Sequence, residues 1–301
     1  MKTLFVLLLL FAIVMIWSAI EQKFLTVKSY AVHSDKISKD LDGTSFVVLA
    51  DLHNMTFGKG NDRLAERIDK LSPDFIVVAG DLVDKNLLCY PGNAYKLLEN
   101  LAGKYKIYYA YGNHEQRLIQ YASGEWPEDK KKLHASWLEY KVRLKKLNVE
   151  FLDNSSAFYY KNNNKICIHG LSIADEFFKK GKAVVMKKEY LATLLGNTND
   201  ICYNLLIAHN PFYFHDYVSW GADLTVSGHI HGGMVRLPGI GGIVSPQVRF
   251  FPKYDSGLFT EDDKSMIVSR GLGTHSYMPR LFNVPEIVHI KLMAKTDSMD
   301  N

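Results

Sequence analysis

The hydrophobic positions in the first half of the chain form two alternating kinds of segment. Three short runs rich in β-branched and aromatic residues predict strands at residues 46–50, 75–79 and 107–111. Between them, in residues 64–71 and 94–101, apolar side chains recur every three or four positions, as in an amphipathic helix. This order predicts parallel strands covered by helices, with functional residues gathered beyond the carboxyl ends of the strands.

The second half of the chain continues with similar runs. The further elements expected there are a helix over residues 133–147 and strands at 166–169, 204–208 and 224–227. The last two apolar runs, residues 265–269 and 286–292, look like antiparallel strands that close a second sheet. Because no repeat or low-complexity linker interrupts residues 44–294, we interpret them as one domain.

The N-terminus has a different pattern. The 17 residues from Leu4 to Ile20 contain no charge and no helix breaker. This length exceeds the core of a usual signal peptide, roughly 7–15 residues, and just reaches the roughly 17–25 needed to cross a bilayer. Trp17 also occupies a position where a cleavage site needs a small residue. We therefore expect an uncleaved membrane anchor over residues 1–22, with a cleaved signal peptide as the alternative.

The anchor predicts a single-pass membrane protein whose orientation stays open. Four lysines follow the apolar stretch within twenty residues and only Lys2 precedes it, which favours a cytoplasmic domain. However, a short Met-Lys start before an apolar run is typical of many exported anchors. The polar segment 23–43 is expected to be juxtamembrane, with a weak edge strand at 24–32, and residues 295–301 form a polar tail.

Composition narrows the possible partners. Of the 301 residues, 47% are hydrophobic and 23% are charged, which is ordinary for a folded protein. The net charge of +4 without a block of like charges gives no reason to expect nucleic acid, and no protein partner is implied. Cys89, Cys167 and Cys202 are too few and too widely spaced for a disulfide framework or a zinc knuckle. We expect all three to be buried small hydrophobic side chains.

Polar side chains that can bind metal follow five of the predicted strands. They are Asp51 and His53; Asp81 and Asp84; Asn113, His114 and Glu115; His209; and His229 and His231. Because a doubly wound sheet brings its strand ends to one rim, we expect these side chains to form one site. Aspartate and asparagine oxygens mixed with histidine nitrogens suit Mn, Fe or Zn better than magnesium.

The number of candidate ligands indicates two ions. Seven residues qualify, whereas a catalytic zinc-like centre takes three protein ligands and keeps one position open. Two ions that share one carboxylate fit this number. The candidates are Asp51, His53, Asp81, Asn113, His209, His229 and His231.

The same residues carry a family resemblance. Their order and spacing resemble the five-block signature of the calcineurin-like metallophosphoesterases, and residues 271–286 resemble the membrane-anchored bacterial subgroup. The five blocks are Asp51-x-His53, Gly80-Asp81-x-x-Asp84, Gly112-Asn113-His114-Glu115, His209 and Gly228-His229-x-His231. The resemblance implies a four-layer αββα sandwich and hydrolysis of phosphoric esters at a dinuclear centre.

The resemblance also implies a role for each residue. It assigns Asp51, His53 and His231 to the first metal, and Asn113, His209 and His229 to the second. Asp81 would bridge the two ions. His114 would stand beside the scissile group without binding metal, and Asp84 would support the site. Glu115 replaces the aspartate usual in the family, with one more methylene for reaching His114.

The substrate is less closely defined by the sequence. The Gly- and Pro-rich loop 232–252 is either a flap that faces the substrate or a hairpin that covers the core. The anchored subgroup includes enzymes acting on lipid-linked phosphodiesters or pyrophosphates such as UDP-2,3-diacylglucosamine, so we expect a membrane-associated substrate. Alternatives are a broad phosphomonoesterase or nucleotide phosphodiesterase and, more remotely, a non-catalytic metal-bound scaffold. Candidate phosphate-binding residues, each also explicable as structural or solvated, are Arg236, Arg270, His275 and Arg280.

Overall fold

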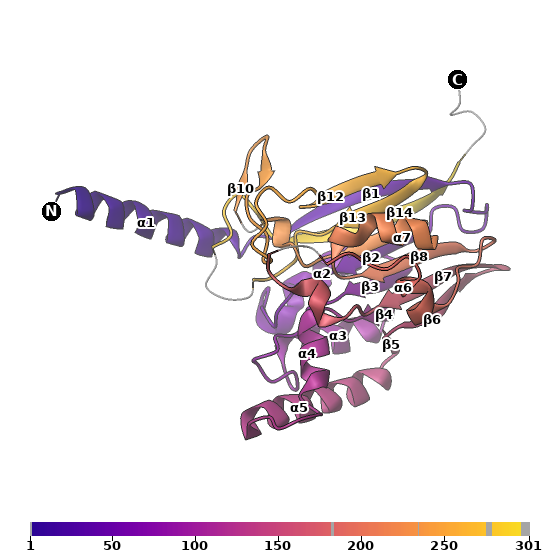
Figure 1. Cartoon of the computed structure of the whole chain (residues 1–301), viewed down its shortest axis with the longest axis horizontal. Coiled ribbons are helices and arrows are strands. Elements are labelled where there is room, and N and C mark those ends of the chain that lie inside the picture. The colour runs from indigo at the N-terminus through magenta and orange to yellow at the C-terminus, as the bar shows by residue number, and fades with distance from the viewer. Residues whose placement is uncertain (1, 182–183, 234, 275–278, 296–301) are drawn as a thin grey trace.

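The computed structural model describes residues 2–181, 184–233, 235–274 and 279–295. Two six-stranded sheets face each other in the body of the protein, and helices cover their outer faces (Figure 1). One further helix, α1 (Lys2–Glu21), projects away from this body.

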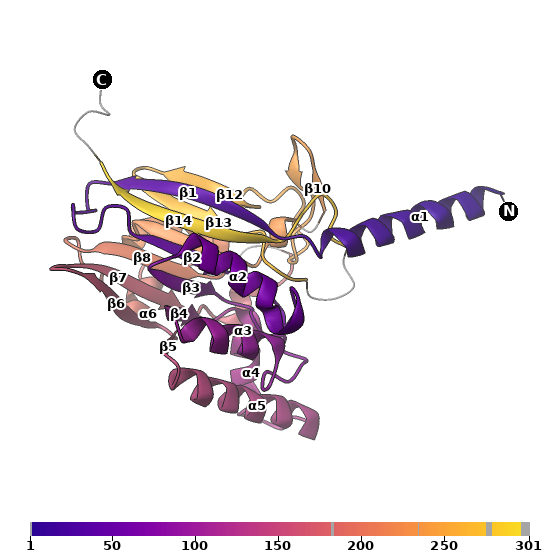
Figure 2. The same ribbon diagram turned by 180° about the vertical axis from the view of Figure 1, so that it is seen from behind.

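The first sheet has the strand order β1-β14-β2-β3-β4-β5, in which β2 to β5 are parallel. Its strands are β1 (Thr26–Ser34), β2 (Ser45–Leu49), β3 (Phe75–Ala79), β4 (Lys106–Ala110), β5 (Val149–Leu152) and β14 (Glu286–Ala294). Four helices pack on its outer side (Figure 2). They are α2 (Asp62–Leu71), α3 (Asn93–Ala102), α4 (Asn113–Gln120) and α5 (Glu128–Lys145).

The second sheet has the order β12-β13-β9-β8-β7-β6. Its strands are β6 (Ser155–Lys161), β7 (Asn164–Leu171), β8 (Tyr203–Ala208), β9 (Leu224–Ser227), β12 (Gly257–Glu261) and β13 (Lys264–Val268). Helices α6 (Tyr190–Leu195) and α7 (Phe214–Trp220) pack on its outer side. A small hairpin, β10 (Arg236–Leu237) and β11 (Gly241–Gly242), lies within the loop 232–252.

The central strands are apolar on both faces because each face meets a different layer. In β2, Phe46 and Val48 lie in the core between the sheets, whereas Val47 and Leu49 lie under the helices. In β8, the residues facing the other sheet and those facing α6 and α7 alternate in the same way. The predicted four-layer αββα sandwich is therefore confirmed.

The last two strands differ from the sequence prediction. Residues 265–269 do join the second sheet, where β13 runs parallel to β9 and antiparallel to β12. In contrast, β14 lies in the first sheet, antiparallel to β2 and parallel to β1, so the prediction that these runs pair together is wrong. The expected edge strand at 24–32 is present as β1, which pairs with β14 over its nine residues.

The cysteine prediction is also wrong for two of the three residues. Cys167 and Cys202 form a disulfide, whereas Cys89 is a buried free thiol as expected. The pairing follows from the sheet, because β7 and β8 are neighbours and Cys202 directly precedes β8. The 35-residue separation hides this proximity in the sequence.

Helix α1 is long and apolar enough to cross a membrane, with a mean hydropathy of 2.8. Most of its side chains are exposed, but the end nearest the body is fixed to it. There Ser18 and Glu21 are buried, and the Glu21 carboxylate accepts the backbone N–H groups of Phe282 and Asn283. The foot of the apolar helix is thus hydrogen-bonded to the loop that precedes β14.

Candidate metal centre

The carboxyl ends of β2, β3, β4, β8 and β9 bring the candidate ligands to one rim. Three groups of side chains each place their donor atoms within 4.8 Å of one another, and all members are buried. The groups are Asp51, His53 and His231; His53, Asp81 and His114; and Asp81, His209 and His229. The two histidines of the sequence Gly228-His229-Ile230-His231 therefore belong to different groups, and Asp81 is shared by two groups.

The two aspartates are central to the cluster. Oδ1 of Asp51 lies 3.5 Å from Nε2 of His231, 3.7 Å from Nε2 of His209 and 4.0 Å from Nε2 of His53. Oδ2 of Asp81 lies 3.2 Å from Nε2 of His209. The ring nitrogens of His53 and His231 are themselves 3.2 Å apart. Carboxylate oxygens and imidazole nitrogens thus converge on one small volume.

The backbone is strained at these positions. Five of the candidate ligands have φ angles between 49° and 71°, a region that residues other than glycine rarely occupy. They are Asp51, His53, Asp81, His229 and His231. Strained conformations of this kind concentrate at functional sites, where the surrounding fold holds side chains in a required direction.

Two glycines let the strand ends approach each other closely. A Cβ atom on Gly112 would lie 2.1 Å from Oδ1 of Asp81, and one on Gly228 would lie 2.5 Å from Oδ2 of Asp51. Both distances are far below van der Waals contact. Any larger residue would therefore displace one of the two central carboxylates.

Two histidines are held as metal-binding tautomers. Nδ1 of His209 lies 2.7 Å from the carbonyl oxygen of Ala79, and Nδ1 of His231 lies 3.1 Å from that of Gly273. A carbonyl only accepts, so each Nδ1 carries the proton and donates it. The Nε2 lone pair of each neutral ring therefore faces the cluster, as in metal-ligating histidines oriented by a backbone carbonyl.

His114 is held in the opposite tautomer. Its Nδ1 accepts the backbone N–H of Lys85 at 3.2 Å. When neutral, this ring must carry its proton on Nε2, which lies 3.9 Å from Oδ2 of Asp81. His114 thus directs an N–H donor, not a lone pair, toward the cluster.

The donor set fits divalent first-row metal ions. The side-chain oxygen of Asn113 is buried without a hydrogen-bond partner among the described residues. A buried acceptor left without a donor is costly unless a cation or water satisfies it. Together with the carboxylates and imidazoles, it completes a mixed oxygen and nitrogen set suited to Mn, Fe or Zn. The clusters are compatible with a dinuclear site.

Burial and mutual proximity perturb the protonation of these side chains. Burial raises the pKa of Asp51 to about 7. Burial alone would lower the pKa of His209, but the neighbouring Asp81 and Asp51 raise it to about 10. Burial likewise opposes ionisation of Asp81, yet His209 and His114 hold its pKa well below the ordinary value. Without metal, the structure thus favours a protonated His209 beside an ionised Asp81. A metal cation bound between these side chains would replace the proton of the histidine.

Glu115 and Asp84 lie beside the cluster and shape its loops. The sequence suggested that Glu115 reaches His114, but its buried carboxylate accepts the backbone N–H of Asp81 at 2.8 Å and of Gly112 at 2.9 Å. It ties the β3 end to the β4 end. Asp84 accepts the N–H of Asn86 at 2.7 Å and so forms the turn that contains Lys85.

The candidate phosphate-binding arginines have other partners in the structure. Arg280 is 1% exposed and donates to the carbonyl oxygens of Arg270, Gly271, Gly273 and Asn283. It therefore holds the loop whose Gly273 carbonyl orients His231.

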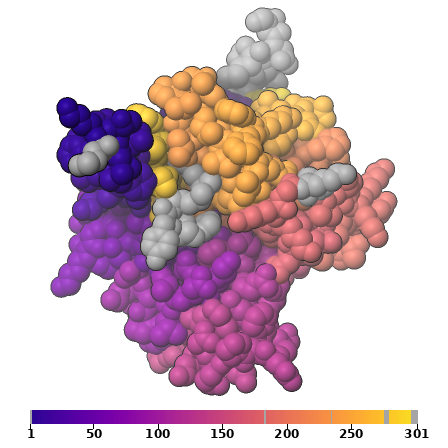
Figure 3. Space-filling view, turned by 60° about the vertical axis from the view of Figure 1, so that its left-hand side comes forward, coloured from indigo at the N-terminus to yellow at the C-terminus, as the bar shows by residue number. Residues whose placement is uncertain are grey.

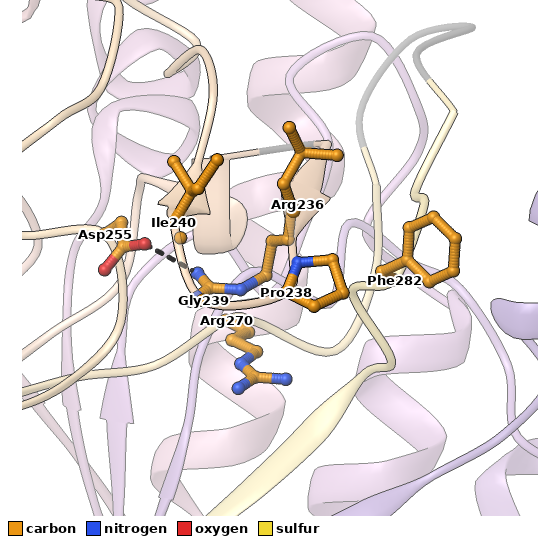
Figure 4. Close-up of a pocket in the computed structure, with 9 residues that line it drawn as sticks. Arg236, Pro238, Gly239, Ile240, Asp255, Arg270 and Phe282 are labelled. Carbon is orange, nitrogen blue, oxygen red and sulfur yellow. Dashed lines mark ion pairs between the residues drawn. The ribbon is translucent and has the colours of Figure 1, made fainter.

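Arg236 pairs with Asp255 at 2.9 Å, and both line a cavity of about 460 Å³ together with Arg270 and Phe282 (Figure 4). Arg270 lies 3.5 Å from Glu286. His275 lies outside the described residues.

The arrangement agrees with the comparison against known families. The model of the calcineurin-like phosphoesterases matches residues 44–233 of this chain. The chain belongs to this family. It is a calcineurin-like phosphoesterase, and the phosphoester hydrolase activity expected from its motifs follows from that membership.

Three relatives are similar to this chain over most of its length. The chain is 27% identical over 289 residues to an Aquifex aeolicus metallophosphoesterase, covering 93% of this chain and 96% of the relative. It is 25% identical to a Caenorhabditis elegans metallophosphoesterase and to a Danio rerio transmembrane protein with a metallophosphoesterase domain. These matches cover 88% and 86% of this calcineurin-like phosphoesterase but only 52% and 55% of the relatives. The chain spans about half the length of these two animal proteins.

Several residues of the rim were not identified from the sequence. The ring of Phe178 lies 5.1 Å from that of His229 and 6.2 Å from that of His209. Lys85, Lys179 and Lys180 surround a cavity next to Asn113. The sequence Phe177-Phe178-Lys179-Lys180 could have drawn attention to these residues. However, nothing in the sequence indicates that this segment lies beside the strand ends.

Proposed function

We propose that this calcineurin-like phosphoesterase hydrolyses phosphoric esters at two ions: one held by Asp51, His53 and His231, the other by Asn113, His209 and His229, with Asp81 between them. The observation that carries this assignment is the opposite hydrogen bonding of the histidines. Nδ1 of His209 and of His231 donates to a carbonyl, so that Nε2 of each ring faces the cluster, whereas Nδ1 of His114 accepts an amide proton.

The protein groups then divide the remaining tasks. Metal ions at such a site lower the pKa of bound water and neutralise phosphoryl charge. His114 presents its Nε2–H toward the position of the ester, where it can protonate a leaving oxygen or hold a phosphoryl oxygen. Glu115 and Arg280 keep the loops of Asp81 and His231 in place through their backbone contacts.

We also propose that the substrate is membrane-associated, such as a lipid-linked phosphodiester. An apolar cavity of about 450 Å³ at the foot of α1 is lined by Trp17, Ile20, Phe24, Phe282 and Val284, with Glu21. Phe282 also lines the cavity that contains Arg236 and Arg270. Figure 3 shows the N-terminal helix close to the segment 236–255. An apolar cavity beside a polar one supports an amphiphilic substrate.

The direct test of this function is hydrolysis by the full-length protein in detergent. We expect Mn²⁺-dependent cleavage within a panel of para-nitrophenyl phosphate, bis-para-nitrophenyl phosphate and a lipid-linked diphosphate diester, and loss of cleavage after chelation. Preference for the lipid-linked ester over the soluble esters supports the membrane-associated substrate. Preference for the monoester indicates a broad phosphomonoesterase instead. A metal-loaded, folded protein that cleaves none of these esters would contradict the proposal.

A separate prediction concerns the anchor. If α1 spans the bilayer, the full-length chain should stay in the membrane fraction after a carbonate wash, because such a wash removes proteins held only at the surface. The matched control is a chain that begins at residue 23, which retains β1 but lacks α1 and should be recovered in the soluble fraction. Release of the full-length chain by carbonate, or a mature N-terminus at residue 20 or beyond, would refute the anchor.

A further inference from the structure

A second polar cavity adjoins the candidate metal centre at Asn113. It has a volume of about 300 Å³ and is formed by the β3–α3 loop, the start of α4 and the segment around η2 (Asp175–Phe178). Its lining residues are Lys85, Asn113, Arg117, Asp175, Phe178, Lys179 and Lys180. Asn113, a proposed metal ligand, is thus also part of the wall of this cavity.

The cavity has an excess of positive charge that is not neutralised by ion pairs among the described residues. Its one carboxylate, that of Asp175, already pairs with Arg117 at 2.8 Å. The ammonium groups of Lys85, Lys179 and Lys180 have no ion-pair partner within the described part of the chain. Three free lysines around one concave surface produce a potential that attracts anions, and lysine is a common phosphate binder.

Two contacts connect this cavity to the reacting centre. The backbone N–H of Lys85 binds Nδ1 of His114, so the lysine that lines the cavity also fixes the proposed proton donor. The ring of Phe178 lies edge-on to that of His229 at 5.1 Å and forms part of the cavity wall. The cavity and the candidate metal centre are therefore in contact at Lys85 and Phe178.

We propose that this cavity binds a second phosphate of the substrate, so that the preferred esters are organic diphosphates. The inference rests on the proposed function, because the first phosphoryl group is placed at the metal centre. It also assigns phosphate binding to other residues than the sequence suggested. Arg236 and Arg280, which the sequence suggested, are occupied by Asp255 and by backbone carbonyls, whereas Lys85, Lys179 and Lys180 are available.

The test compares two competitors of para-nitrophenyl phosphate hydrolysis in the full-length, Mn²⁺-loaded protein. UMP carries one phosphate, and UDP-glucose carries the same nucleoside with a diphosphate diester. In the wild-type protein we expect UDP-glucose to compete about tenfold more tightly than UMP. In the double variant Lys179→Ala/Lys180→Ala this advantage should fall to about twofold or less.

The matched control is Lys187→Ala/Lys188→Ala, which removes two exposed lysines of the same connection that do not line the cavity. It should retain the full advantage of UDP-glucose. Equal competition by the two ligands in the wild-type protein, or an advantage that survives in the Lys179/Lys180 variant, would overturn the inference. If the metal-loaded protein hydrolyses neither para-nitrophenyl phosphate nor the other esters named above, the proposed function fails instead. Calorimetric binding of UDP-glucose and UMP to the same variants then tests the cavity on its own.

Discussion

Replacing Asp81 by asparagine is expected to remove activity toward every phosphoester, whatever its leaving group. Asp81 belongs to two of the three groups of converging side chains, and its Oδ2 lies 3.2 Å from Nε2 of His209. The amide has nearly the same shape, but it lacks the charge that two cations would share. Substituting a residue that only hydrogen-bonds to a metal ligand already lowers metal affinity about 10–100-fold. We therefore expect a larger loss of metal affinity when Asp81 itself is replaced. Metal content by elemental analysis and the rates for a monoester and a diester measure it.

The control for this variant is Asp263→Asn, which makes the same chemical change at a side chain that is 72% exposed. It should keep its metal and its activity. The fold of Asp81→Asn is checked by circular dichroism, because Oδ1 of Asp81 also accepts the N–H of His114 at 2.8 Å. Wild-type metal content and activity in a folded Asp81→Asn protein would contradict the bridging role.

His114→Ala should have an effect that depends on the leaving group. Its Nδ1 is held by the Lys85 amide, so the ring presents Nε2–H to the centre and is not arranged as a ligand. The variant should therefore retain its metal. A general acid contributes roughly 10²–10⁴-fold where the departing oxygen needs a proton, so an alkyl diester should be affected that strongly. A para-nitrophenyl ester, whose phenolate departs without protonation, should be affected much less.

The surface substitution His215→Ala is the matched control, because this ring is 79% exposed and pairs with Glu261. It should change neither rate. Loss of metal in His114→Ala would show that His114 is a ligand. This alternative has to be tested because His114 lies close enough to His53 and Asp81 to bind the same ion. Equal losses for both esters would indicate that His114 positions the phosphate and does not donate a proton.

The sequence predicts the centre of the fold better than its edges. Short apolar runs separated by helical patterns predict β2, β3 and β4, because these strands are buried on both faces and lie side by side in chain order. The partners of β13 and β14 do not follow from pattern, since β14 alternates like any half-buried strand and returns to the first sheet between β1 and β2. The Cys167–Cys202 disulfide depends on the same long-range pairing.

The site could be located from the sequence because its residues directly follow strands. Parallel strands leave Asp51, Asp81 and His209 little choice of position once the sheets form. What the sequence lacks is hydrogen-bond direction: that His209 and His231 donate from Nδ1, whereas His114 accepts there, depends on backbone groups from distant segments. The lysine-lined cavity was missed for the same reason, because Lys85 and Lys179 are distant in the sequence and line one cavity only in the folded chain.

We propose that this calcineurin-like phosphoesterase holds two metal ions at the ends of its strands. Elemental analysis of the purified full-length protein, loaded with Mn²⁺ and freed of excess metal by gel filtration, tests it most directly. We expect close to two first-row metal ions per chain, removed by chelator together with phosphoesterase activity. One ion or none in a folded and fully active protein would contradict it.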